Sequence, residues 1–348
     1  MKQERKLFVV LGIHRSGTSA LTRGLQTFGI SLGEDLLPEN FFNPKGHWED
    51  VSFHDFNITL LEALGDRYPR ILPIDEEEVT FLCARGFFEQ AVDLLANKAK
   101  ETPLLGLKNP RSSLLLPFWK KVFQQAGLVP YFLIALREPW SVAISNKNYA
   151  LIEDDEVAFW TYISYLLSSL EETVSYQRIV VDYGELLINP KHQLERIARI
   201  FGLSTDPELL EEYCSDFIDP MLCHSQAERK VSQEETFDQE LAIIIYKNLL
   251  LVAQDQESLE ALHPLVQEWK KKFLKAHPLL LLERKNNFTS NQLKELMEER
   301  KEVARQLQKL INKNSYQLAS LCQILHQKNL QVALLEQELA TMVPHHQQ

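Results

Sequence analysis

Residues 7–19 read LFVVLGIHRSGTS, five apolar residues followed by a turn bounded by Gly12 and Gly17. The apolar run is typical of a buried strand, and the residues after the turn follow a helical pattern. A G-x-x-x-x-G turn between a strand and a helix has the spacing of a phosphate-binding loop, in which backbone N–H groups bind an anion. The lysine that bridges phosphates in an NTPase is replaced by Thr18, and Arg15 supplies a cation inside the loop instead. A guanidinium can hold two phosphate oxygens at once, so we expect an anion site that does not hydrolyse ATP or GTP in the usual way.

Three further apolar runs follow, at Leu104–Lys108, Tyr131–Leu136 and Ile179–Tyr183, and helical patterns alternate with them as far as Phe201. Such an alternation predicts an α/β fold: a P-loop-like, three-layer parallel sheet flanked by helices. Ligands of these folds bind at the carboxyl ends of the strands, where all the motifs below fall. The stretch 29–103 is less regular, and 204–283 reads as mostly helical.

The C-terminal part has a different pattern. From about Leu293 to Met342 there is neither Gly nor Pro, and leucines recur in multiples of seven residues at 293, 307, 321 and 335. This spacing predicts a coiled coil or a long helical hairpin, and a single amphipathic helix packed on the domain is the alternative. We therefore expect an α/β domain over 1–283 and a helical tail over 284–348, through which the chain can form a homo-oligomer.

Composition excludes several classes of protein. The 348 residues contain 37 Lys and Arg against 48 Asp and Glu, and the net charge of −11 disfavours a nucleic-acid partner. The four cysteines include no C-x-x-C pair, which argues against a disulfide framework or a zinc site and fits a reducing compartment. No apolar run approaches the ~20 residues of a membrane span. We expect a cytoplasmic protein.

The loop resembles the signature loop of the sulfotransferase family, x-x-[RK]-S-G-T-[ST], here Arg15-Ser16-Gly17-Thr18-Ser19. In that family the loop binds the 5′-phosphosulfate of PAPS (3′-phosphoadenosine 5′-phosphosulfate), and its cation polarises the bridging oxygen. The resemblance implies PAPS as co-substrate, no metal, and these five residues as its binding loop.

Two later segments match the family in order. Arg137-Glu138-Pro139, with Ser145 eight residues after the arginine, resembles the turn and helix whose Arg and Ser bind the 3′-phosphate. Tyr183, which opens Y-G-E-L-L-I-N-P, resembles the tyrosine that lies beside the adenine. A carbonyl-capping arginine and a strand-end aromatic are the structural alternatives. His224 and Arg229-Lys230 are candidates for a second phosphate clamp.

A fourth match is Lys108-Asn109-Pro110-Arg111, where many cytosolic members carry K-T-H-x-P. Lys108 aligns with the lysine that neutralises charge on the transferring sulfuryl group. The family's general base, a histidine, falls on Pro110, which cannot accept a proton. The form is similar to the K-D-P-R of bacterial carbohydrate- and small-molecule-type sulfotransferases, which implies a bacterial protein. Arg111 is either structural or faces an acidic acceptor.

The general base must then come from elsewhere, because sulfuryl transfer needs cations on the leaving side and a proton acceptor on the attacking side. Glu49, in the loop N-P-K-G-H-W-E-D, is our first candidate. His47 is the second, since an unperturbed histidine titrates near neutrality. Glu34 is the third, and for each the alternative is a solvated loop residue.

The expected function is transfer of the sulfuryl group from PAPS to a hydroxyl or amine of a small-molecule, glycan or lipid acceptor. Two other classes remain open. A P-loop nucleotide or metabolite kinase needs the missing lysine and a Mg²⁺-binding Asp. A non-catalytic nucleotide-binding coiled-coil scaffold predicts loss of Arg15 or Lys108, and both are present.

Overall fold

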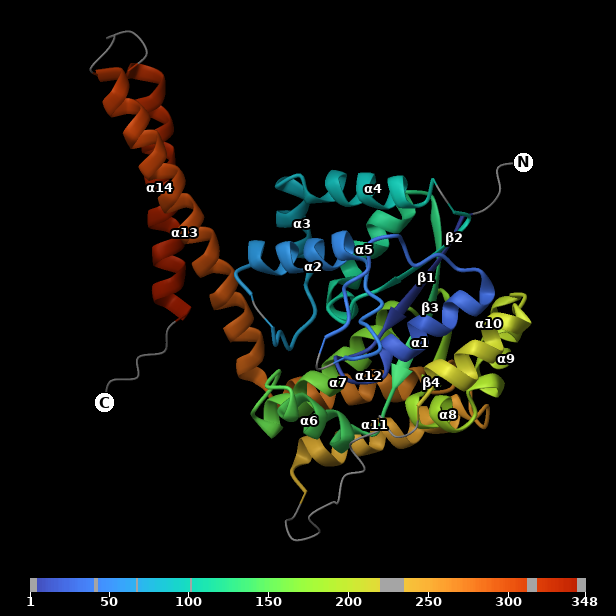
Figure 1. Ribbon diagram of the computed structural model, residues 1–348. Helices are drawn as coiled ribbons and strands as arrows, with labels where there is room; N and C mark the ends of the chain where they lie inside the picture. Colours follow the sequence, from blue (N-terminus) through green and yellow to red (C-terminus); the bar gives the residue numbers. More distant parts are fainter. Residues whose placement is uncertain are drawn as a thin grey trace. The chain divides into compact units, whose positions relative to one another are not determined.

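Four parallel strands form the central sheet of the computed structural model, which describes residues 5–40, 43–66, 68–100, 102–219, 235–311 and 318–342. The strands are β1 (Arg5–Leu11), β2 (Leu104–Lys108), β3 (Leu128–Leu136) and β4 (Gln177–Asp182), in the order β2-β1-β3-β4 (Figure 1). Val10 of β1 lies opposite Lys108 on one side and Leu133 on the other, so the carboxyl ends of the central strands share one edge. The predicted parallel sheet is confirmed.

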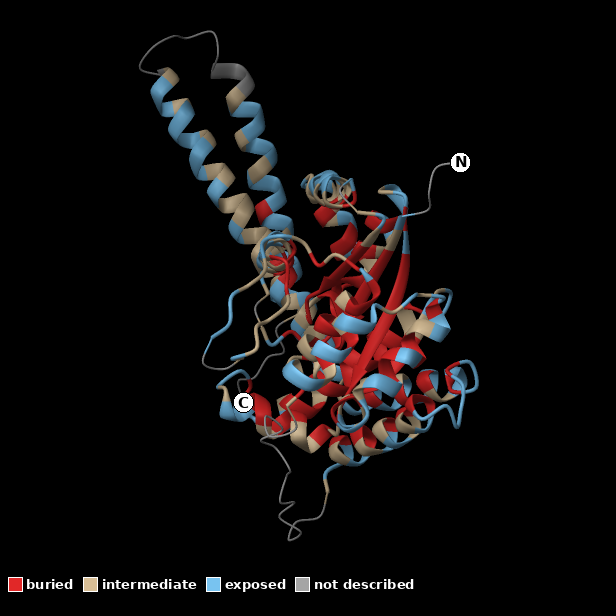
Figure 2. Ribbon diagram, turned by 45° about the vertical axis from the view of Figure 1, so that its right-hand side comes forward, coloured by how far each residue is buried: buried red, intermediate tan, exposed pale blue. Residues whose placement is uncertain are grey.

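Helices cover both faces of the sheet, as expected for strands that are apolar on both sides. Phe8 and Val10 point into a core made with α1 (Thr18–Gly24) and α9 (Pro190–Phe201). On the other face α5 (Ser112–Gln125) packs on β3 and α7 (Asp155–Glu172) packs on α5. Figure 2 shows the buried strands between these layers. The remaining helices of this part are α2 (Val51–Ala63), α3 (Glu76–Ala84), α4 (Phe87–Lys98), α6 (Pro139–Asn148), α8 (Tyr183–Ile188), α10 (Pro207–Glu212), α11 (Phe237–Ala253) and α12 (His263–Ala276), with a 3-10 turn at Leu25–Phe28 and a π-helical turn at Tyr213–Phe217.

Three of these helices, α2, α3 and α4, lie in the stretch that the sequence pattern left irregular. The start of α3 is fixed by a capping box, in which the Asp75 side chain accepts from the backbone N–H of Glu78 and the Glu78 carboxylate accepts from that of Asp75. Glu78 also pairs with the buried Arg70 at 2.8 Å. The strand expected at 179–183 begins two residues too late, since β4 starts at Gln177, and ends one residue too late, because Tyr183 begins α8 after the N-cap Asp182.

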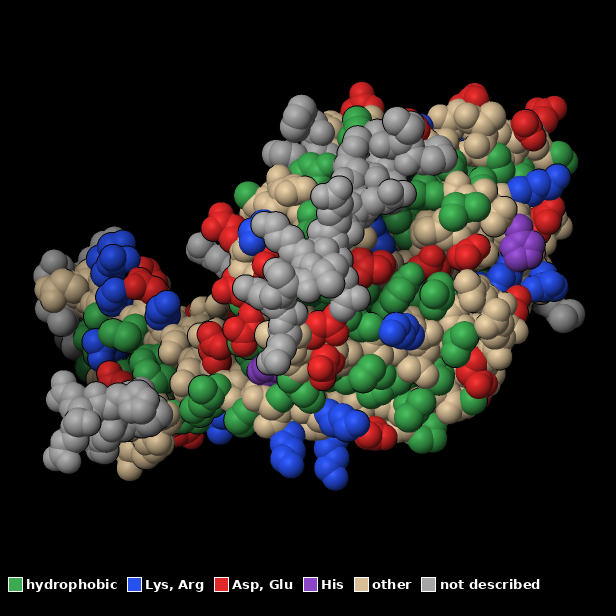
Figure 3. Space-filling model, turned by 90° about the horizontal axis from the view of Figure 1, so that it is seen from below, with side chains coloured by type: hydrophobic (Ala, Val, Ile, Leu, Met, Phe, Trp, Pro, Cys, Tyr) green, Lys and Arg blue, Asp and Glu red, His purple; other side chains and the backbone are tan. Residues whose placement is uncertain are grey.

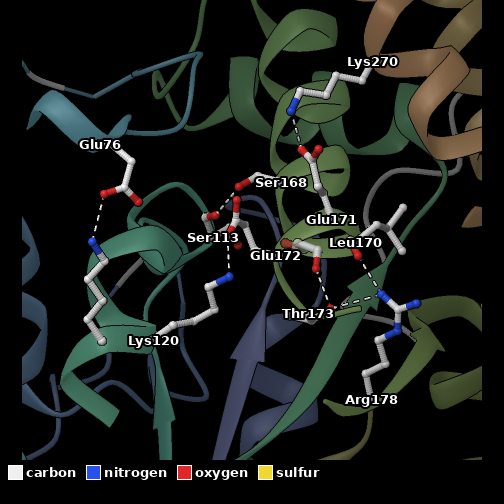
Figure 4. A network of polar contacts seen from close by, with 12 residues as sticks. Glu76, Ser113, Lys120, Ser168, Leu170, Glu171, Glu172, Thr173, Arg178 and Lys270 are labelled. Atoms are coloured by element: carbon white, nitrogen blue, oxygen red, sulfur yellow. Dashed lines mark hydrogen bonds and ion pairs between the residues drawn. The ribbon is translucent and has the colours of Figure 1, made fainter. Parts of the chain in front are cut away.

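A polar network fixes α7 against its neighbours (Figure 4). The Ser168 hydroxyl donates to the Ser113 carbonyl at 2.6 Å, and Glu172 pairs with Lys120 of α5 at 2.6 Å. The Ser113 hydroxyl in turn accepts from the backbone N–H of Gly12 at 3.1 Å. The loop after β1 is therefore tied to the helical layer behind the sheet.

The chain forms two compact units, Met1–Leu60 with Tyr68–Ala276, and Leu61–Arg67 with His277–Gln348. The second unit contains α13 (Pro278–Ile311) and α14 (Leu318–Met342), which lie side by side (Figure 1). An ion pair between Lys328 and Glu299 joins them. The tail is thus a pair of packed helices rather than a single helix, while the coiled coil and the boundary at residue 283 stay predictions.

Both acidic and basic side chains lie on the face shown in Figure 3. Of the helices that the structure describes, none is long and apolar enough to cross a membrane. Among the same residues, no group of three or more His, Cys, Asp or Glu is placed to hold a metal ion.

Candidate active site

The loop between β1 and α1 has the backbone of an anion-binding turn. Gly12, Arg15 and Gly17 have positive φ angles of 143°, 70° and 90°. The Ser16 hydroxyl donates to the Ile13 carbonyl at 2.7 Å and so closes the turn from within. Turns that combine left- and right-handed residues direct successive N–H groups to one side, where they bind oxyanions.

A cavity of about 190 Å³ opens beside this loop, at the carboxyl end of the sheet. The loop and α1 contribute Arg15 and Ser19, β3 contributes the Arg137 that follows it, and α8 contributes Tyr183. The other lining residues are Gly17, Thr18, Ala20, Asn43, Pro44, Lys45, Gly46, Tyr149, Leu187, Phe217, Ile218 and Asp219.

Arg15 is held at this cavity by three neighbours. Its Nε donates to the Ser145 hydroxyl at 3.0 Å, and its guanidinium lies 3.9 Å from the centre of the Tyr149 ring. Its carbonyl accepts from the Arg137 guanidinium at 2.7 Å. Burial lowers the pKa of Arg15, although a guanidinium stays protonated throughout the physiological range. The cation predicted from the loop is therefore fixed in place and charged.

Arg137 and Tyr183 form the far side of the same site. The Arg137 guanidinium lies 4.9 Å from the centre of the Tyr183 ring, and the Arg137 carbonyl accepts from the Tyr162 hydroxyl at 2.8 Å. The Tyr183 ring also lies against Gly17, where an added Cβ would come within 2.2 Å of its Cδ2. Only glycine fits at position 17, both for its φ angle and for this contact.

Lys108 lies beneath the loop in a second polar cluster. Its Nζ pairs with Glu49 Oε1 at 2.6 Å and donates to the Ser19 hydroxyl at 3.2 Å. The other Glu49 oxygen accepts from the Asn109 amide at 2.7 Å. Burial lowers the pKa of Lys108, and the charge on Glu49 opposes this shift. The Ser19 hydroxyl in turn donates to the His47 carbonyl at 3.0 Å, so the loop 43–50 is bound to α1.

The structure thus places Arg15, Ser19, Arg137 and Tyr183 around one cavity. Ser145 bonds to Arg15, and Lys108, Glu49 and His47 adjoin Ser19. Thr18 is buried, 4% exposed, at the start of α1. Glu34 is exposed, and within the described residues no hydrogen bond or ion pair joins it to this cluster. His224 and Arg229-Lys230 lie outside the described residues.

Two contacts at the site were missed by the sequence reasoning. Tyr149 follows Ser145 by one helical turn, so an i, i+4 reading of α6 could have placed both at Arg15. Asn43 donates to the Ser19 hydroxyl at 3.3 Å, from a loop whose path no local pattern indicates.

A parallel sheet with a glycine-bounded loop after its first strand, and with Arg15 and Arg137 at its carboxyl edge, is the arrangement of a P-loop-like α/β fold. The model of the Sulfotransferase family matches residues 8–207, which include Arg15, Lys108 and Arg137. The chain belongs to the sulfotransferase family.

Two solved structures are similar to this chain. The sulfotransferase domain of the Synechococcus PCC 7002 olefin synthase is 16% identical, with a TM-score of 0.44, over 71% of this chain and 96% of that one. The sulfotransferase domain from the curacin biosynthetic pathway is 15% identical, with a TM-score of 0.43, over 70% and 98%. A search of curated protein sequences finds no significant match.

Proposed function

We propose that this sulfotransferase uses PAPS as donor and transfers its sulfuryl group to a hydroxyl or amine, releasing adenosine 3′,5′-bisphosphate. The observation that carries the proposal is the convergence of Arg15, Ser19 and Lys108 at one anion-binding loop, in a chain of this family. The cations that we assign to the reaction are side chains.

The residues around the cavity fit the two ends of the donor. Arg15 and the backbone of the loop would hold the 5′-phosphosulfate, because the guanidinium is fixed by Ser145 and Tyr149. Arg137, with Ser145, would hold the 3′-phosphate. Tyr183 would flank the adenine, and its ring is already positioned by Gly17.

Lys108 would neutralise the negative charge that develops on the sulfuryl group during transfer. PAPS supplies the sulfuryl group, whose bond to the leaving phosphate oxygen breaks as the acceptor oxygen or nitrogen bonds to sulfur. A buried cation acts strongly on such charge, because little water screens it. Lys108 is 2% exposed, and Glu49 and Ser19 hold its Nζ.

The contacts favour His47 over Glu49 as the general base, which reverses our order of preference from the sequence. Both Glu49 oxygens already accept hydrogen bonds, from Lys108 and Asn109. Burial and then the charge on Lys108 lower the pKa of His47, so its imidazole is neutral and able to accept a proton at pH 7. Glu49 then serves to hold Lys108.

The other two classes fit the site less well. A kinase needs a cation at position 18 to bridge phosphates, and Thr18 is buried there. A scaffold has no need to bury Lys108. We extend the proposal to a bacterial cytoplasmic enzyme with a small-molecule, glycan or lipid acceptor. We also propose that the chain self-associates through α13 and α14. The molecular mass in solution, compared with and without residues 285–348, tests this self-association.

Thermal stabilisation tests the donor. Adenosine 3′,5′-bisphosphate should raise the melting temperature, ATP with Mg²⁺ should not, and Arg15→Ala should remove the effect. Arg199→Ala, an exposed arginine paired with Asp255 at 3.1 Å, is the matched control. Stabilisation by ATP with Mg²⁺ alone would favour the kinase.

A further inference from the structure

Three side chains beside Lys108 take no part in the site described so far: Arg111, Tyr68 and His14, here called the Arg111 cluster. The Arg111 guanidinium lies 5.8 Å from the centre of the Tyr68 ring, and the rings of His14 and Tyr68 are 4.3 Å apart, edge to face. Arg111 follows Lys108 by three residues and His14 precedes Arg15. The cluster therefore adjoins both cations to which we assign the sulfuryl group.

The polar atoms of this cluster lack partners. Within the described residues, no carboxylate or other hydrogen-bond acceptor contacts the Arg111 guanidinium. The Tyr68 hydroxyl and Nδ1 of His14 are shielded from solvent, and neither makes a hydrogen bond. A buried polar group without a partner costs about 1–3 kcal/mol, and native proteins rarely leave one. Two such atoms beside an unpaired guanidinium indicate a ligand group that is bound there during function.

The charge around the cluster indicates the sign of that group. The neighbouring cation Lys108 has a carboxylate of its own, because it pairs with Glu49. Among the residues that the structure describes, the charge on Arg111 has no such counterpart. Burial and then this charge lower the pKa of His14 well below its usual value, so the imidazole is neutral and adds no cation. An oxyanion complements this arrangement, since the guanidinium, the hydroxyl and the imidazole tautomer with its proton on Nδ1 are all hydrogen-bond donors.

We propose that the acceptor carries an anionic group, a carboxylate or phosphate, which the Arg111 cluster binds while the attacking hydroxyl or amine lies near Lys108. The proposal rests on the proposed function and names its substrate class. Tyr68 is partly exposed, so a rotation of its side chain would open a path for the anion to the two shielded atoms. Arg111 would determine the specificity for anionic acceptors, because it would contact the acceptor away from the reacting atoms.

Binding of inorganic phosphate to the full-length protein tests this assignment. With adenosine 3′,5′-bisphosphate saturating the donor site and ionic strength held constant, phosphate should shift the ring resonances of His14, assigned with His14→Gln. Arg111→Gln should raise the phosphate Kd about tenfold or more, because a charge-assisted bond is lost. Arg199→Gln, an exposed arginine, should leave the Kd unchanged.

A second variant guards against misfolding. Tyr68→Phe removes a buried hydroxyl that makes no hydrogen bond within the described residues, so the variant should melt at or above the wild-type temperature and still bind phosphate more weakly. In a transfer screen of hydroxylated acceptors, carboxylates should be preferred to the matching carboxamides, and Arg111→Gln should abolish the preference.

Three results would overturn the proposal. They are an unchanged phosphate Kd in Arg111→Gln, no response of the His14 resonances to phosphate, and a loss of bisphosphate affinity in Arg111→Gln as large as its loss of phosphate affinity. The last would make Arg111 part of the donor site. Failure of the proposed function would give a different result, because adenosine 3′,5′-bisphosphate would then not bind at all. In that case the phosphate Kd of the protein without bisphosphate, measured for Arg111→Gln and for Arg137→Gln, still tests whether Arg111 binds the anion.

Discussion

Glu49→Gln should destabilise the free protein because it leaves the charge of Lys108 buried without a counter-charge. The two side chains are 7% and 2% exposed and their charged atoms are 2.6 Å apart. Removing one partner of a buried pair costs about 3–5 kcal/mol. Since the glutamine keeps an oxygen that can accept a hydrogen bond from Asn109, we expect the free energy of unfolding to fall by an amount near the lower end of this range, about 3 kcal/mol.

The pair Lys121–Glu76 provides the matched control. Its atoms are 2.8 Å apart, but its side chains are 48% and 75% exposed. Exposed pairs contribute about 0.2–1 kcal/mol, so Glu76→Gln should cost less than ~1 kcal/mol.

Urea unfolding followed by circular dichroism measures both effects at pH 7, with a double-mutant cycle for each pair in which the lysine becomes methionine. The coupling energy should be about 2 kcal/mol or more for Lys108–Glu49 and below ~1 kcal/mol for Lys121–Glu76. Equal coupling energies in the two cycles would refute the reasoning, because burial would then have no effect on the pair.

Three further predictions follow from the same contacts. The instability of Glu49→Gln relative to wild type should lessen as pH rises from 7 to 10. Burial lowers the folded-state pKa of Lys108 and the charge on Glu49 opposes this shift, so the pKa falls further in the variant than in wild type. Between that pKa and about 10.4 the unfolded chain binds more protons than the folded one, so the free energy of unfolding rises more with pH in the variant. A constant difference in urea titrations would contradict this. Gly17→Ala should lower the free energy of unfolding by about 3 kcal/mol or more. Gly29→Ala should lower it by roughly 1 kcal/mol, because position 29 also has a positive φ, of 69°, but an added Cβ meets no atom within 4 Å there. Similar melting temperatures for the two variants would disprove the contact between Gly17 and Tyr183. Ser145→Ala should weaken binding of adenosine 3′,5′-bisphosphate about tenfold by calorimetry, whereas Ser215→Ala, on the surface, should not; equal affinities would remove Ser145 from the site.

The sheet could be predicted because its strands are apolar on both faces, so Leu7–Leu11 and Leu104–Lys108 stand out as continuous runs. The end of β4 could not, because Asp182 caps a helix that turns Tyr183 out of the strand. Helix α3 was signalled by Asp75 and Glu78, whereas apolar residues on α2 are not confined to one stripe.

The loop cation and Lys108 could be predicted because each belongs to a local motif next to a strand. The pairing of Lys108 with Glu49 could not, since 59 residues and three helices separate them along the chain. The unpartnered atoms of His14 and Tyr68 are likewise a property of packing, and no spacing in the sequence indicates them.

Acceptor-dependent release of adenosine 3′,5′-bisphosphate from PAPS is the most direct test of the central claim. Chromatography of reactions with pools of hydroxyl and amine acceptors, including carboxylates and phosphates, measures it. We expect the wild-type chain to release adenosine 3′,5′-bisphosphate with at least one acceptor pool. Lys108→Met should lose this release and still bind the bisphosphate. Release by Lys108→Met equal to that of the wild type, with or without acceptor, would contradict this claim.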